Sequence, residues 1–169
     1  LSHGHRDPTA VLRSLDHYAK RAPGVFGSSL FYARLDPVTG TLTYSNAGHL
    51  PPMLLSPGEA PRVLDGGRGP IAGLDGPRAA DTIRLAEGDI LVGYTDGLVE
   101  RRNEAIDVGL ERLAAASADP PQTLAALTDH LIEQVPGERR GDDIAILALR
   151  RTQGAQIDEI SPRRASAGL

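Results

Sequence analysis

The chain has 169 residues, of which 40% are hydrophobic, and it carries a formal net charge of −4. This length and hydrophobic content predict one globular domain rather than a disordered chain. The absence of cysteine excludes disulfides, zinc–thiolate centres and cysteine nucleophiles. Because the net charge is negative, nucleic acid and anionic membranes are not expected as main partners. No apolar run approaches the roughly 18 residues that span a bilayer, so we expect a cytoplasmic protein.

The first half of the sequence predicts one helix followed by a strand hairpin. Asp7 can cap a helix and Pro8 suits its first turn, and apolar residues then recur at helical spacing. Asp-Pro-Val-Thr-Gly at 36–40 is typical of a turn, so its flanking segments predict paired strands. The predicted elements are a helix ending at 22–24, strands at 28–35, 41–45 and 53–55, and a glycine-rich loop at 64–77.

The second half predicts two strands, two helices and a last strand. The apolar run 144–149 is typical of a strand covered on both faces. We expect residues 151–169 to form a disordered tail, because they are polar and aperiodic. Strand hairpins followed by helices and one more strand indicate an α+β fold with mostly antiparallel pairing. The predicted elements are strands at 82–85, 90–94 and 144–149, and helices at 108–116 and 121–135.

The first candidate site is the sequence Tyr94-Thr95-Asp96-Gly97, where a hydrophobic strand ends in an acid followed by glycine. An acid at a strand end is held by rigid backbone, and glycine allows another group to approach closely. This arrangement suits a carboxylate ligand of a hard metal ion. Asp-Gly is also among the commonest turn dipeptides, so the motif alone leaves a simple turn as the alternative.

The second candidate site is Gly141-Asp142-Asp143-Ile144, at the entry to the last strand. Neighbouring residues on a strand point to opposite faces, so only one of the two carboxylates is expected to reach a given metal ion. Repulsion between the two acids must be offset by a cation or by solvent. The alternative is an ordinary solvated strand entry.

Two further groups have open roles. His49, in the tight turn Asn46–Pro52, is either a structural histidine that hydrogen-bonds across the turn or a ligand, base or phosphate contact. Arg139 and Arg140 precede the acidic pair, and a guanidinium fork suits phosphate oxygens, although surface arginines beside acids are common. No nucleophile elbow and no Gly-Lys-Ser/Thr phosphate loop is present.

Four segments, taken together and in this order, identify a protein family more specifically than any one of them does alone. They are Phe31–Pro37, Asn46–Pro52, Gly88–Glu100 and Gly141–Ala145. Together they resemble the stage II sporulation protein E branch of the PPM, or type 2C, protein phosphatases, and 88–100 is the most specific segment. The resemblance covers residues 7–150, which we therefore predict to be a PPM-type phosphatase domain. It implies two packed, mostly antiparallel sheets flanked by helices, an αββα sandwich.

The same resemblance implies a reaction. Members of the family hydrolyse phosphoserine or phosphothreonine, here on an anti-anti-sigma factor, with two Mn²⁺ or Mg²⁺ ions that activate a bridging water for direct attack on phosphorus. Asp96 and Asp142 match metal ligands of the family, and Asp143 stands at the second position of the final acid pair. No residue of this chain matches a further catalytic group. An upstream sensor domain is also implied.

The chain departs from the family pattern near its N-terminus. The Gly-Gly-Asp and Gly-Asp-Val-x-Gly-His-Gly motifs, which supply the acid that bridges both metals, are absent. We therefore expect an N-terminally truncated domain with about half of the metal shell. Two alternatives remain: a degenerate, non-catalytic phosphatase fold that binds a regulatory partner, and a metal-dependent hydrolase of another phosphoester.

Overall fold

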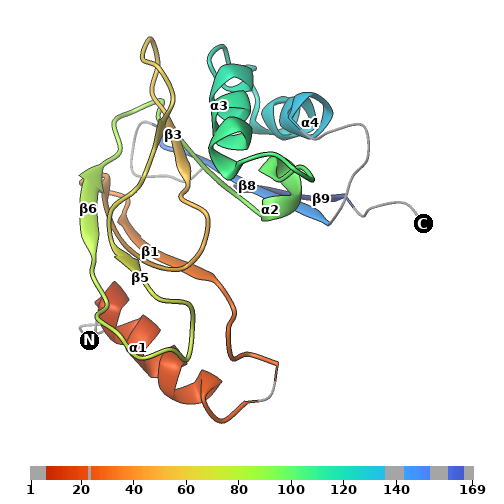
Figure 1. The fold of residues 1–169 in the computed structure, drawn as a ribbon. Helices are drawn as coiled ribbons and strands as arrows, with labels where there is room; N and C mark the ends of the chain where they lie inside the picture. Colours follow the sequence, from red (N-terminus) through yellow and green to blue (C-terminus); the bar gives the residue numbers. More distant parts are fainter. Residues whose placement is uncertain (1–6, 23, 136–142, 153–159, 166–169) are drawn as a thin grey trace. The chain divides into compact units, whose positions relative to one another are not determined.

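The computed structural model describes residues 7–22, 24–135, 143–152 and 160–165. The chain forms two compact units, Leu1–Pro51 with Asp65–Leu85, and Pro52–Leu64 with Ala86–Leu169. Each unit holds one sheet, and nearly all strand pairs are antiparallel. The α+β class with two antiparallel-rich sheets and helices (Figure 1) is confirmed.

The first unit combines one helix with a four-stranded sheet. Strand β2 is central: it pairs with β1 and β6 in antiparallel fashion and with β5 in parallel. Helix α1 packs on β1 and β2. The elements are α1 (Pro8–Ala19), β1 (Leu30–Asp36), β2 (Thr41–Ala47), β5 (Arg68–Gly69) and β6 (Asp81–Arg84).

Local hydrogen bonds explain where these elements begin and turn. The Asp7 carboxylate accepts the amide of Thr9 at 3.1 Å and caps α1, as its sequence position predicted. At the β1–β2 turn the Asp36 carboxylate accepts the amide of Val38 at 2.9 Å, and Gly40 adopts a positive φ of 73°. A side chain is unfavourable at such a φ, so glycine fixes this tight return.

A buried ion pair joins α1 to the glycine-rich segment. The Arg78 side chain is 1% exposed and Asp16 is 15% exposed. Arg78 donates to the two carboxylate oxygens of Asp16, from Nε at 2.9 Å and from Nη2 at 2.5 Å. It also donates to the carbonyl oxygen of Pro70, and the Gly73 amide donates to Asp16 at 3.0 Å. The segment predicted only as a loop is therefore held by one arginine.

The Asp16 carboxyl is stabilised in its charged form. Burial would raise its pKa, but the hydrogen bonds from Arg78 and Gly73 and the positive charges of Arg78 and Lys20 hold the pKa below its ordinary value. A carboxyl with a lowered pKa in the folded state contributes stability above the pKa of the unfolded chain. That contribution is lost as the pH falls from about 4 through the lower, folded-state pKa.

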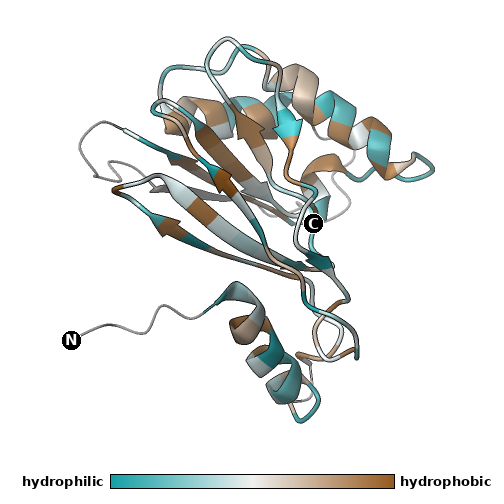
Figure 2. Ribbon diagram, turned by 90° about the vertical axis from the view of Figure 1, so that its left-hand side faces the viewer, coloured by the Kyte–Doolittle hydropathy of each residue, from teal (hydrophilic) through white to brown (hydrophobic). Residues whose placement is uncertain are grey.

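The second unit carries a five-stranded antiparallel sheet in the order β4-β3-β7-β8-β9. Helix α4 packs on β8 and β9, and α3 contacts α4 and α2. In Figure 2 the helices carry alternating hydrophobic and hydrophilic residues, as expected of helices with one buried face. The elements are β3 (Met53–Leu55), β4 (Arg62–Val63), β7 (Ile90–Tyr94), α2 (Asp96–Val99), α3 (Ile106–Ala116), α4 (Leu124–Gln134), β8 (Ile144–Arg150) and β9 (Ile160–Ala165).

Three expectations need correction in this unit. Residues 160–165 form β9, paired with β8, so the predicted disordered tail is wrong for these six residues. Their polar, aperiodic sequence carries no strand signal, and Pro162 is tolerated because β9 is an edge strand. Burial alternates along β8 and Leu147 is 48% exposed, so only one face is covered. Helix α4 begins at Leu124 rather than at 121, because the Thr123 hydroxyl accepts the amide of Ala126 and caps it.

No helix in the described part of the chain is both long and apolar enough to cross a membrane.

Replacing Asp16 with alanine should destabilise the protein by about 3 kcal/mol or more, because Arg78 would stay buried without its charge partner. Chemical denaturation at pH 7 measures this loss. The matched control is Asp65→Ala, which removes an ion pair to Arg68 whose side chains are 60% and 66% exposed and should cost at most about 0.5 kcal/mol. Equal losses in the two variants would contradict the role assigned to the buried pair.

Candidate metal site at the edge of the second sheet

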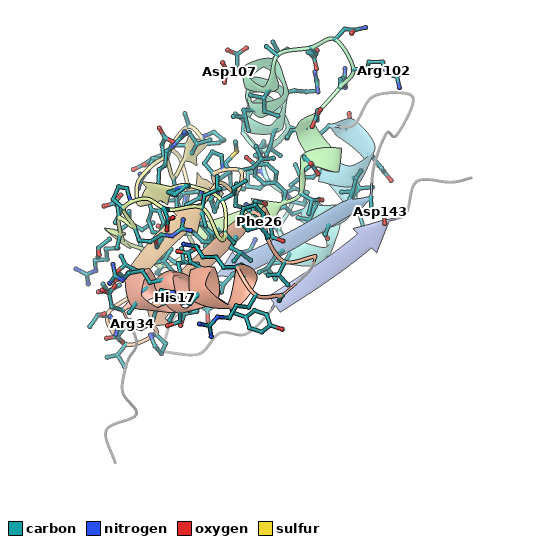
Figure 3. The ribbon with its side chains drawn as sticks, turned by 60° about the horizontal axis from the view of Figure 1, so that its bottom comes forward. His17, Phe26, Arg34, Arg102, Asp107 and Asp143 are labelled. Atoms are coloured by element: carbon teal, nitrogen blue, oxygen red, sulfur yellow. The ribbon has the colours of Figure 1, made fainter. Side chains whose placement is uncertain are left out.

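The pairing of β7 with β8 brings two distant acidic motifs to one edge of the sheet. The strands are antiparallel and in register from Ile90 opposite Arg150 to Tyr94 opposite Ile146. The end of β7 therefore lies beside the start of β8. We call this region the acidic edge and define it as Thr95, Asp96 and residues 143–145. Figure 3 shows Asp143 at this start of β8.

Thr95 links the two strands at the acidic edge. Its amide donates to the carbonyl oxygen of Ala145 at 3.0 Å. Its hydroxyl accepts the Ala145 amide at 2.9 Å and donates to the carbonyl oxygen of Asp143 at 3.2 Å. The position of the Asp143 backbone is therefore tied directly to the residue that precedes Asp96.

Asp96 is exposed at the first position of the short helix α2. Its carboxylate accepts the amide of Gly97 at 2.9 Å, and no Lys or Arg of the described residues forms an ion pair with it. Behind it, Leu98 and Val99 are fully buried. Asp96 is thus a solvent-facing acid on a turn that is anchored in the core.

Close packing of α3 supports that turn. Gly109 of α3 lies so near α2 that a Cβ at this position would be 2.1 Å from the carbonyl oxygen of Val99.

Two arginines connect this region to α4. Arg101 and Arg112 donate to the carbonyl oxygen of Val135, at 2.9 and 3.3 Å, which satisfies the C-terminal end of α4. These contacts fix the backbone on which Asp96 is presented.

Tyr94, the last residue of β7, is a buried phenol. Burial raises the pKa of Tyr94 above its ordinary value, because the charged phenolate is disfavoured away from water. The residue therefore stays neutral and acts as a hydrophobic anchor directly before Thr95.

The structure leaves part of the predicted site untested. Asp142, Arg139 and Arg140 lie outside the described residues, so the predicted proximity of Asp96 and Asp142 stays a prediction. Asp143 is exposed at the strand entry. The expectation that Asp142 rather than Asp143 faces Asp96 also stays a prediction.

His49 lies in the first unit and is used within its own turn. The Asn46 side chain donates to the carbonyl oxygen of His49 and accepts the His49 amide, both at 2.8 Å. The His49 Nδ1 atom lies 2.8 Å from the carbonyl oxygen of Leu50. A carbonyl oxygen only accepts, so this contact requires the proton on Nδ1. These bonds match the structural alternative for His49.

The donor chemistry of the acidic edge suits Mn²⁺ or Mg²⁺, because both are hard cations that prefer carboxylate oxygens. Asp96 fits such an ion, since it is exposed and no described cation neutralises it. Within the described ranges no group of three or more His, Asp or Glu residues is placed to hold a metal ion. The described residues therefore fit a partial ligand set rather than a complete one.

Sequence reasoning singled out Asp96 but missed the role of Thr95. The Thr-Asp-Gly motif indicated a role for its acid. The role of the Thr95 hydroxyl could not be predicted, because it depends on the pairing of β7 with β8. The second residue it missed is Gly109, whose closeness to Val99 follows only from tertiary packing.

Comparison with known proteins places these features in a family. Residues 1–152 match the family model described as stage II sporulation protein E, SpoIIE. The chain belongs to the SpoIIE family.

One relative and several solved structures are similar to this chain. The chain is 30% identical over 132 residues to Protein IcfG of Synechocystis sp., which covers 73% of this chain and 20% of IcfG. The structure of the RsbU and RsbW domains of Rv1364c from Mycobacterium tuberculosis is similar with a TM-score of 0.75 and 28% identity, covering 89% of this chain and 44% of that one. The chain thus spans about a fifth of the length of IcfG and less than half of the Rv1364c structure.

The SpoIIE phosphatase domain itself shows the same fold. The manganese-presoaked structure of the phosphatase domain of SpoIIE from Bacillus subtilis has a TM-score of 0.60 and 17% identity. The match covers 89% of this chain and 69% of that one. At this identity the likeness concerns the fold alone, and it agrees with the α+β architecture described above.

Replacing Gly109 with alanine should destabilise the second unit by about 1–3 kcal/mol, because the added methyl group would overlap the Val99 backbone. An unstrained helical Gly→Ala change would instead stabilise the helix by about 0.5–1 kcal/mol. Thermal unfolding measures the difference. Gly93→Ala is the matched control, since a Cβ there meets nothing within 4 Å; a Gly109→Ala protein as stable as the wild type would contradict the close packing.

Proposed function

We propose that the chain is part of a metal-dependent protein serine/threonine phosphatase of the PPM type. Its membership of the SpoIIE family carries this proposal, together with one structural observation: β7 and β8 bring Asp96 and the backbone of Asp143 to the same sheet edge. Separate acids gathered at a rigid strand edge suit the binding of a hard cation.

Asp96 and Asp142 are the residues proposed to hold the metal, and Asp143 is proposed to point to the opposite face. Two Mn²⁺ or Mg²⁺ ions, when bound, would neutralise phosphate charge and lower the pKa of a bound water. The chain's own contribution is to present Asp96 on an anchored turn and to keep the start of β8 beside it. The manganese-soaked SpoIIE phosphatase domain supports the choice of metals.

The proposed substrate is phosphoserine or phosphothreonine on an anti-anti-sigma factor. Support comes from Rv1364c, in which RsbU and RsbW domains occur together, and from the SpoIIE family match. A cytoplasmic location and an attached sensor domain belong to the same proposal. A screen against small phosphoesters and phosphoproteins separates this substrate class from other phosphoester substrates.

A second candidate function is a non-catalytic module that binds a regulatory partner. The observation that favours it is the partial ligand set: two carboxylate motifs, and no described group of three metal-binding side chains. Measured turnover separates the two candidates.

The two acids of the final pair should differ in their effect on metal binding. Asp142→Ala is expected to weaken Mn²⁺ binding by at least about tenfold and Asp143→Ala to change it little, because neighbouring strand residues point to opposite faces. Titration of the full natural-length protein with Mn²⁺, followed by calorimetry, measures both affinities. Loss of binding in Asp143→Ala alone would reverse the assignment.

Activity should depend on Asp96 and on residues beyond this chain. The full natural-length protein should release phosphate from a phosphoserine protein in millimolar Mn²⁺, and Asp96→Asn should lower turnover by at least about a hundredfold. The 169-residue chain alone should show negligible turnover, because two carboxylates leave Mn²⁺ mostly hydrated.

Asp107→Asn serves as the control. Asp107 is an exposed acid in the first turn of α3, and Figure 3 shows it well apart from Asp143. Its replacement should leave turnover unchanged. Robust turnover by the 169-residue chain that is lost in Asp96→Asn would show that the chain is sufficient. Full activity of Asp96→Asn in the full natural-length protein would overturn the metal site.

A further inference from the structure

The chain leaves β7 at Thr95 in a way that creates a hydrogen-bonding conflict. In an antiparallel ladder the carbonyl oxygen of Thr95 would accept the amide of the residue opposite it, Ala145. That carbonyl instead accepts the amide of Leu98 at 3.1 Å, which closes the first turn of α2. The carbonyl group of Thr95 is thus turned toward α2, and the Ala145 amide takes its hydrogen bond from another acceptor.

The Thr95 hydroxyl resolves the conflict. It accepts the Ala145 amide at 2.9 Å in place of the backbone carbonyl, and it donates to the Asp143 carbonyl at 3.2 Å. A hydroxyl has one donor and two acceptor positions, so a single group can make both bonds. The turn into α2 begins immediately at Asp96, while β8 remains attached up to Asp143.

Thr95 does not act as an ordinary helix cap. It occupies the N-cap position of α2, yet its side chain makes no cap hydrogen bond. The hydroxyl that would usually satisfy the helix amides is directed across to β8 instead. This use of the side chain favours the alignment of two strands over the stability of a four-residue helix.

We propose that Thr95 is a positioning residue for the metal-binding acids: its hydroxyl fixes the start of β8 against Asp96, and the metal affinity depends on this link. The inference rests on the proposed phosphatase function. Partners that orient metal ligands typically contribute about 10–100-fold to metal affinity. Serine keeps a hydroxyl at this position, whereas valine keeps the shape and removes both bonds.

The test compares Thr95→Val and Thr95→Ser in the full natural-length protein, at a temperature where circular dichroism shows all variants folded. Free Mn²⁺ is counted from its electron paramagnetic resonance signal during titration, and the Mn²⁺ concentration for half-maximal phosphate release is measured in parallel. Thr95→Val should weaken Mn²⁺ binding by about tenfold or more, and Thr95→Ser should restore binding to within about threefold of the wild type.

Thr128→Val is the matched control. The Thr128 hydroxyl donates to the carbonyl oxygen of Ala125 at 2.9 Å inside α4, so this variant also loses a threonine hydrogen bond in the same unit. It should lower stability without changing Mn²⁺ affinity. Equal Mn²⁺ affinity in Thr95→Val and the wild type, or equal weakening in Thr128→Val, would overturn the positioning role.

Asp96→Asn separates this inference from the proposed function. If Asp96→Asn abolishes Mn²⁺ binding and Thr95→Val does not weaken it, the phosphatase site stands and the role of Thr95 is wrong. If the wild type binds no Mn²⁺, or Asp96→Asn binds it normally, the proposed metal site fails and the role of Thr95 fails with it.

Discussion

The acidic edge depends on how one strand ends. The carbonyl oxygen of Thr95 closes α2, and its hydroxyl completes the pairing with β8. With an apolar side chain at this position the Ala145 amide would lose its partner on β7, and the Thr95 amide alone would tie the start of β8 to the turn. The start of β8 would then be held less firmly beside Asp96.

The first unit solves a similar problem by a different route. Its segment at 70–73, within the glycine-rich stretch 64–77, is irregular, and irregular backbone has no ladder to satisfy its carbonyl groups. Arg78 donates to the carbonyl oxygens of Pro70 and Ile71, and Asp16 of α1 accepts both Arg78 and the Gly73 amide. In both units one polar side chain therefore fixes the backbone where regular structure ends.

These two interactions also mark the limit of what the sequence predicts. The start of the first helix at Pro8 and the β1–β2 hairpin follow from local signals that the structure confirms: a cap, a turn sequence and periodicity. The helix ends at Ala19, earlier than the predicted end at 22–24. The carboxylate of Asp96 was recognisable because a hydrophobic strand preceded it. The hydroxyl of Thr95 and the close approach of Gly109 were not, because each role depends on a residue far away in the sequence. Strand β9 was not predicted for a similar reason. It is a strand because it pairs with β8, and its own polar sequence does not indicate one.

Electrostatics bears on the choice between a catalytic and a purely binding role. Asp96 is exposed and pairs with no Lys or Arg of the described residues, and the amide and hydroxyl of Thr95 hold the backbone of residues 143–145 beside it. Where the carboxylates at such an edge face one another, they repel unless a cation offsets their charge. A module that only bound a protein partner would gain nothing from an additional hydrogen bond that keeps these acids together. A metal-binding edge would gain affinity from it, because ligands fixed in advance lose less conformational entropy when the ion binds. The link made by Thr95 is therefore better explained by the proposed phosphatase site than by a binding module.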